Sequence, residues 1–286
     1  MIGRPHRLRA RSLGVLLVSS ALGGCILFTR LHGAAGYGDA ELAARLIERG
    51  ADVNRRDIRG ETPLHHAAFA GFIDVSALLL DNGADPDAAD REGITPLHLA
   101  ALHRHAALAD LLLDRGANID ARDDNGATPL YLAAGQSDPD FVAHLLGRGA
   151  RPHIATRDGA TPLHMAVFWH DGETASLLLD EGAAVDQTDA AGNTPLNWAA
   201  NHQIVDLARL LLARGADPDR ASLDGASPMF WAVRSQNREL AQLLLAHGAT
   251  ADATELGRLI GVAPVEVTAF LAEGMRKPQA GRPDGG

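Results

Sequence analysis

An internal repeat of 33 residues constrains this chain more than any other feature of its sequence. The tetrapeptide Thr62-Pro63-Leu64-His65 is followed by five identical or related tetrapeptides at this spacing, without insertion or deletion. The later copies begin at Thr95, Thr128, Thr161, Thr194 and Ser227. Such a regular period predicts a solenoid, in which each repeat is one small unit that packs against its neighbours in the sequence.

Each repeat carries the signals of two short helices and a turn. Thr62 can cap the first helix by accepting from an early backbone N–H, and Pro63 fits the first helical position, where its missing N–H is not needed. The second helix is expected to run from about Val75 to Asn82, because it carries an apolar run and Gly83 can end it. The Asp-, Pro- and Gly-rich stretch that follows predicts a projecting turn.

One unit with two short helices cannot bury its apolar face alone, so stacking is required to form a continuous core. A small residue at one fixed position would let neighbouring helices approach closely. Alanine holds that position at Ala67, Ala100, Ala133, Ala166, Ala199 and Ala232.

The pattern of a turn, Thr-Pro-Leu-His-x-Ala-Ala, a leucine-rich helix and Gly-Ala-Asp resembles the ankyrin-repeat family over roughly Thr29 to Thr250. The resemblance implies an all-α solenoid of stacked helix–turn–helix units with short β-hairpin fingers. It also implies that His65, His98 and His164 form hydrogen bonds between neighbouring loops. The fourth repeat departs from the family pattern at Gln136-Ser137-Asp138-Pro139. This departure affects the expected local geometry and not the expected fold.

These patterns divide the chain into four parts. Residues 29–250 form the array of about seven repeats, of which the first is degenerate because it lacks the proline. Residues 251–274 predict two capping helices, and the Pro/Gly-rich residues 275–286 predict a disordered tail. Residues 1–28 form a segment of a different kind.

The N-terminal segment has the pattern of a secretory signal, with a basic start before the uncharged stretch Ser12–Thr29. Leu22-Gly23-Gly24-Cys25 resembles a bacterial lipoprotein signal box, which implies lipidation of Cys25 and a tether on the periplasmic side of a membrane. An uncleaved anchor of 18 residues is an alternative. A hydrophobic cap on a cytoplasmic protein is another, and Thr29 opens the first repeat only four residues after Cys25, which leaves little room for a tether.

Composition excludes several classes of protein. The net charge is −10, and the basic residues at the N-terminus make the remainder still more acidic, so binding to a phosphate backbone is not expected. Cys25 is the single cysteine, which rules out an intramolecular disulfide and a cysteine-based zinc site. The repeats must therefore be held together by packing.

No motif in the sequence predicts catalysis or a cofactor. There is no phosphate-binding loop and no nucleophile elbow, and the Asp residues recur with the array as turn residues. The pairs His65-His66 and His103/His105 could supply metal ligands. Adjacent helical residues point apart, however, and no carboxylate lies four residues from these histidines on the same helix in a recognisable site. We therefore expect no enzyme activity, no cofactor and no metal.

Binding residues are expected at positions that differ between repeats, since recurring residues are explained by the unit itself. The resemblance places these positions at the finger tips and on the inner helices. The candidates are Tyr37, Arg59, Phe69, Arg91, Ile94, His103, Asn125, Gln136, Phe168, Trp169, His202 and Arg234. Exposed aromatic and arginine side chains are the usual anchors of an interface. Alternatively, Phe168 and Trp169 fold back onto the next repeat as packing.

The sequence as a whole predicts a non-enzymatic scaffold that binds a partner protein through the concave face and finger tips of the stack, as a monomer. Two alternatives use the same surface. One is a regulator or inhibitor of an enzyme, and the other is a secreted effector that acts on a host protein.

Overall fold

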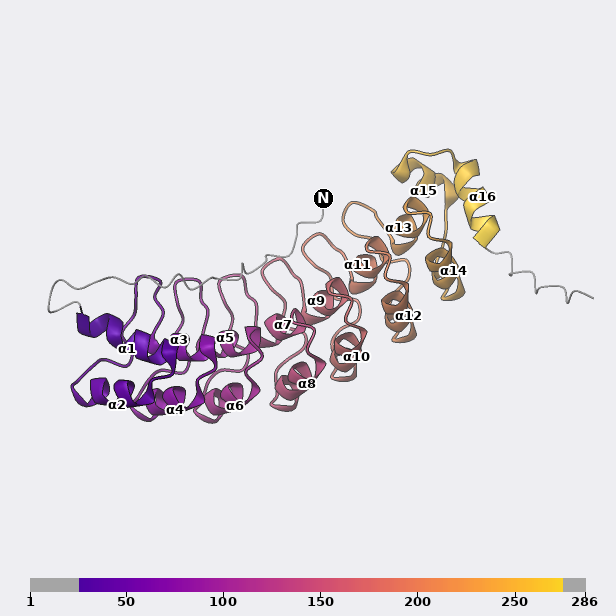
Figure 1. The fold of residues 1–286 in the computed structure, drawn as a ribbon. Helices are drawn as coiled ribbons and strands as arrows, with labels where there is room; N and C mark the ends of the chain where they lie inside the picture. The colour runs from indigo at the N-terminus through magenta and orange to yellow at the C-terminus, as the bar shows by residue number, and fades with distance from the viewer. Residues whose placement is uncertain (1–25, 275–286) are drawn as a thin grey trace, which may run out of the picture.

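Two rows of short helices run side by side along the protein, and loops project from one of them (Figure 1). The structure, a computed structural model, describes residues 26–274. The row beside the loops contains α1 (Ile26–Tyr37), α3 (Pro63–Ala70), α5 (Pro96–Leu102), α7 (Pro129–Ala134), α9 (Pro162–Phe168), α11 (Pro195–Asn201) and α13 (Pro228–Arg234). The other row contains α2 (Ala40–Glu48), α4 (Ile73–Asp81), α6 (Ala106–Asp114), α8 (Pro139–Gly147), α10 (Gly172–Asp180), α12 (Val205–Ala213) and α14 (Arg238–Ala246).

The stack curves toward the side that carries the loops (Figure 1). We call the loops the fingers, the odd-numbered helices α1 to α13 the inner row, and the even-numbered helices α2 to α14 the outer row. Two further helices, α15 (Ala253–Ile260) and α16 (Pro264–Gly274), follow the last pair. The expected solenoid of helix–turn–helix units is therefore the fold of the described residues.

The inner helices α3 to α13 begin as the motif of Thr or Ser followed by Pro predicts. Thr95 has an extended backbone (φ −101°, ψ 166°), its hydroxyl accepts from the backbone N–H of His98 at 3.5 Å, and Pro96 is the first helical residue. At the end of the outer helix, Gly83 has a φ of 85°, which glycine adopts without strain. These two features fix where an inner helix starts and where an outer helix stops.

Buried imidazoles connect one repeat to the next. Nδ1 of His98 accepts from the backbone N–H of Thr95 at 3.1 Å, so Nε2 carries the proton and donates to the carbonyl of Ala127 at 3.1 Å. His65 makes the same bond to Ile94. His164 makes it to Asn193, and the expected role of these histidines between neighbouring loops is confirmed.

The core lies between the two rows and continues from repeat to repeat. Leu97 and Ala100 are completely buried, as are the leucines at the same position of most other repeats. The fully buried members of this series are Leu64, Leu97, Leu130, Leu163, Leu196 and Met229. Because every repeat adds to one connected core, burial in each unit depends on the presence of its neighbours.

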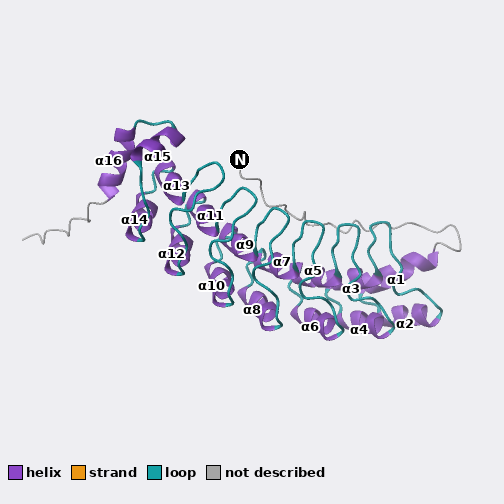
Figure 2. Ribbon diagram, turned by 180° about the vertical axis from the view of Figure 1, so that it is seen from behind, coloured by secondary structure: helices purple, strands orange, loops and turns teal. Residues whose placement is uncertain are grey.

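The fingers are turns and not the β-hairpins that the resemblance implies, since no strand is present among residues 26–274 (Figure 2). Asp57 donates its backbone N–H to the carbonyl of Glu61 at 2.9 Å, and Oδ1 of Asp57 accepts from the backbone N–H groups of Arg59 and Glu61. The next finger is joined to this one by a bond from the backbone N–H of Arg91 to the carbonyl of Arg59. Isolated bonds of this kind close turns without forming a ladder.

The ends of the chain are only partly described. Cys25 and the rest of the predicted signal segment up to residue 25 lie outside the described residues, as does the predicted tail 275–286. Helix α1 begins at Ile26, within the predicted 1–28 segment. In the part of the chain that the structure describes, no helix has the length and apolar character needed to cross a membrane.

We predict that His98→Ala lowers the free energy of unfolding by about 2–4 kcal/mol. The change leaves a cavity and removes the acceptor for Thr95 and the donor for Ala127. Urea unfolding followed by circular dichroism measures the loss. The exposed His153→Ala serves as control and should change the value by less than about 0.5 kcal/mol, and an equal effect of both changes would contradict this role of His98.

We predict that the protein loses stability as the pH falls from about 6.5 to 4. Burial lowers the pKa of His164 to about 4, whereas an unfolded histidine titrates near 6.5. In this window the unfolded chain binds more protons, so acid favours unfolding, on the order of 1–3 kcal/mol for such a histidine.

His164→Asn tests this dependence, because Asn197 holds the same position one repeat later. Urea unfolding at pH 7.5 and pH 5 should show a smaller loss for the variant than for the unchanged protein. Identical losses would show that His164 does not contribute.

Candidate protein-binding surface

The candidate binding residues lie on the inner row and the fingers but differ in exposure. Tyr37 and Trp169 have exposed fractions of 71% and 43%. The other exposed candidates are Arg59, Arg91, Asn125, His202 and Arg234, and the half-buried ones are Phe69, His103, Gln136 and Phe168. Apart from Ile94, all of them are therefore accessible in part on one side of the stack.

Ile94 is not a surface residue, and its assignment as a binding residue is wrong. Its exposed fraction is 4%, and its carbonyl accepts the hydrogen bond from His65. The position before each Thr is buried in the other repeats as well, as with Ala127 and Asn193. The physical reason is that this residue closes the finger turn against the next repeat, so its side chain points into the stack.

A first group of rings lies on α3 and α5. Phe69 meets His103 edge-on at a centroid distance of 4.4 Å, and His103 stacks on His105 at 6.0 Å. Nε2 of His103 is buried without a hydrogen-bond partner. Burial, followed by the charge of His105, lowers the pKa of His103, which keeps the ring neutral. The group offers a partly exposed patch of aromatic rings.

A second group lies on α9 and α11. Phe168 contacts Trp169 at 5.2 Å, Trp198 at 6.0 Å and His202 at 5.6 Å between ring centroids. Trp198 is buried, with an exposed fraction of 5%. Phe168 thus packs partly on the next repeat, whereas Trp169 stays exposed beside it. The expected packing of Trp198 between repeats agrees with these contacts.

Tryptophan occupies the same helical position in two consecutive repeats but has a hydrogen-bond acceptor in only one. Nε1 of Trp198 donates to Oδ2 of the finger residue Asp189 at 3.0 Å. Nε1 of Trp231 is buried without a partner, and Ser222 stands where the other repeat has Asp189. The Arg234 guanidinium lies over the Trp231 ring at 5.5 Å.

Sequence reasoning missed the most exposed finger tip. Ile58 has an exposed fraction of 86%, and Leu223 at the equivalent position has 82%. The signal was available, because the same position holds the candidate Arg91. Apolar side chains held out in solvent at both ends of the finger row extend the candidate surface.

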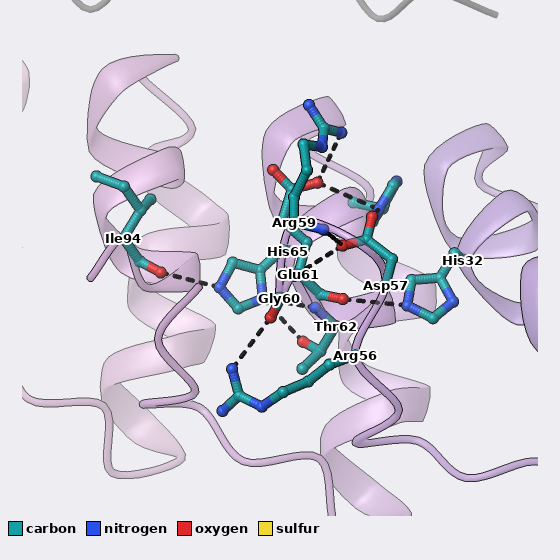
Figure 3. A network of polar contacts seen from close by, with 10 residues as sticks. His32, Arg56, Asp57, Arg59, Gly60, Glu61, Thr62, His65 and Ile94 are labelled. Carbon is teal, nitrogen blue, oxygen red and sulfur yellow. Dashed lines mark hydrogen bonds and ion pairs between the residues drawn. The ribbon is translucent and has the colours of Figure 1, made fainter. Parts of the chain in front are cut away.

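A polar cluster at the first finger was also missed (Figure 3). His66 and His65 point apart, as expected for adjacent helical residues. Nε2 of His66, however, lies 3.3 Å from Oδ2 of Asp57 and 3.4 Å from Oε2 of Glu61. The carboxylates come from the preceding finger and not from the same helix, so the search at helical spacing could not find them.

We predict that Ser222→Asp together with Asp224→Ala, which reproduces Asp189 and Ala191 of the preceding repeat, raises the free energy of unfolding by about 1 kcal/mol. The new carboxylate supplies the acceptor that Nε1 of Trp231 lacks, and the second change removes the carboxylate that the Ser222 hydroxyl now contacts. Urea unfolding measures the change. In a protein that already carries Trp231→Phe, the gain should shrink. A gain of the same size in both backgrounds would show that the new carboxylate does not reach the indole.

Comparisons with known proteins agree with this architecture. A family model described as ankyrin repeats (3 copies) matches residues 31–123, 116–189 and 170–255. Among solved structures, the chain is similar to the ankyrin repeat domain of Bcl-3, described as a unique member of the IkappaB protein family, with a TM-score of 0.68 and 30% sequence identity. That likeness covers 76% of this chain and 97% of the Bcl-3 chain. A comparison with curated proteins finds no match. The matched segments span most of the sequence and coincide with the stacked helix pairs, and the chain belongs to the ankyrin-repeat family.

Proposed function

We propose that this chain is a non-enzymatic scaffold that binds a partner protein across its inner row and finger tips. Ankyrin repeats generally mediate interactions between proteins. The observation that carries the proposal is the division of the side chains into two classes. Residues that recur in every repeat are buried or close turns, whereas most of the candidates that differ between repeats are accessible on one side of the stack.

The composition of that side supports a protein partner. Tyr37, Trp169 and Ile58 expose aromatic and apolar surface, and Arg91 and Arg234 add guanidinium groups. These are the side chains that most often anchor protein interfaces. The acidic charge of the chain argues against a phosphate-rich partner.

The finer hypotheses differ in the identity and location of the partner. A regulator of an enzyme and an effector acting on a host protein would both use the surface described above. Export and tethering through Cys25 stay predictions, since the segment that carries them lies outside the described residues.

A photocrosslinking residue placed at Tyr37 or Trp169, in the cells that make the protein, tests the proposed surface. Both positions should give the same discrete protein adduct, because both side chains are exposed on the inner side. Positions Ala107 and Ala143, which are exposed on the outer helices α6 and α8, are matched controls. Their adduct should be at least several-fold weaker.

Equal adducts from both rows, or an adduct from the outer row alone, would contradict the proposed surface. Circular dichroism of each variant establishes that the helices remain folded. An adduct with one enzyme whose activity falls in its presence would identify the partner class as an enzyme under regulation.

A further inference from the structure

Three side chains from different parts of the first complete repeat converge at one point. Asp57 lies in the finger, Glu61 directly precedes the helix cap, and His66 lies in α3. One ligand atom from each lies within 4.8 Å of the others, and this is the one group of three potential metal ligands within residues 26–274. The distances from Nε2 of His66 to the two carboxylates are 3.3 and 3.4 Å.

The architecture of the repeat does not require this group. The position of Glu61 holds Ile94, Ala127, Ala160, Asn193 and Ala226 in the other repeats. The position of His66 holds Leu99, Leu132, Met165, Trp198 and Trp231. Two departures from the repeat thus meet in space. His66 contacts Oδ2 of Asp57 as Trp198 contacts Oδ2 of Asp189, whereas Glu61 adds a carboxylate that the repeats after it lack.

Asp57 is a recurring finger residue, but its two oxygens have separate roles. Oδ1 closes the turn by accepting from the backbone N–H groups of Arg59 and Glu61. Oδ2 faces His66. The turn therefore holds one carboxylate oxygen in a fixed direction toward the imidazole, without any further cost in side-chain freedom.

The cluster is shielded from solvent and carries negative charge. The side chains of Asp57, Glu61 and His66 are 24%, 10% and 15% exposed. Burial, with a further contribution from His32, lowers the pKa of His66 to about 4, so the imidazole is neutral at pH 7. Arg59 brings a positive charge to the cluster, because its Nη2 lies 2.7 Å from Oε2 of Glu61. A neutral imidazole and two carboxylates are ligands that a divalent cation prefers.

We propose that Asp57, Glu61 and His66 form a binding site for one Zn²⁺ ion, next to the candidate partner surface. Zn²⁺ bonds to nitrogen and oxygen of about 2.0–2.2 Å in a tetrahedron place neighbouring ligand atoms roughly 3.3–3.6 Å apart. The spacing between Nε2 of His66 and each carboxylate already has this value. Water or a side chain from outside the cluster completes the tetrahedron.

Arg59 competes with the metal for Glu61. Its guanidinium occupies Oε2 of Glu61, and its side chain is 42% exposed, so it can swing into solvent. His32 lies beside the cluster, and its Nε2 lies 3.1 Å from the carbonyl oxygen of Glu61 (Figure 3). Binding therefore exchanges one cation for another without unfolding the finger.

Titration of the full-length, chelator-treated chain with Zn²⁺ in a calorimeter tests the site, with Co²⁺ absorption reporting tetrahedral coordination. The unchanged protein should bind one equivalent. His66→Leu and Glu61→Ala should each weaken binding at least tenfold, and Arg59→Asn should tighten it by a factor of two or more. Each replacement is the residue that another repeat carries at that position, in Leu99, Ala127 and Asn125, so the fold should accept it.

His170→Gln is the matched control, since this exposed histidine outside the cluster is replaced by the residue found at Gln203 and Gln236. It should leave the affinity unchanged. The proposal is overturned if the unchanged protein binds no Zn²⁺, or if His66→Leu binds it as tightly. It is also overturned if His170→Gln weakens binding as much as His66→Leu, because the metal would then be bound by scattered surface histidines.

Discussion

The structure depends on the burial of an apolar face that no single repeat can cover. Leu97 is completely buried only because the repeats before and after it lie against its helix pair. The same requirement applies at every step of the stack, so the residues that meet it recur with the period of the sequence. Side chains that face away from the contact between repeats are released from this requirement and are free to differ.

Directional bonds add precision to this packing. The buried imidazole of His98 fixes the start of its own helix and at the same time donates to the carbonyl of Ala127 in the next repeat. Asn197 fills the same position with a different bond, to the carbonyl of Arg220. The contact between repeats therefore tolerates substitution of the hydrogen-bonding group where the apolar packing is kept.

Most of the fold could be predicted because local signals and the period agree: Thr95 and Pro96 start a helix, and Gly83 ends one. The β-hairpin fingers that the family resemblance implied are turns among residues 26–274. A resemblance does not show that each of these turns is closed by isolated hydrogen bonds. Ile94 was misplaced because variation between repeats marks two kinds of position, exposed ones and buried ones that accept side chains of several sizes. Only the packing of one finger against the next distinguishes the exposed positions from the buried ones.

The cluster around His66 shows a different limit. Its members are separated by a finger turn and a helix start, so no spacing in the sequence brings them together, although alignment of the repeats on one another marks Glu61 and His66 as unusual. Trp231 is similar, because its lack of an acceptor follows from the replacement of a finger Asp by Ser222 nine residues earlier. In both cases the useful signal is a departure from the repeat, and the structure shows which departures meet.

The central claim is that recurring residues hold the stack together and differing residues on the inner side do not. The most direct measurement compares the free energy of unfolding of Leu97→Ala with that of Trp169→Ala. We expect a loss of about 2–5 kcal/mol for Leu97→Ala and less than about 1 kcal/mol for Trp169→Ala. A loss for Trp169→Ala as large as that for Leu97→Ala would contradict the account, because the exposed indole would then be part of the structural core.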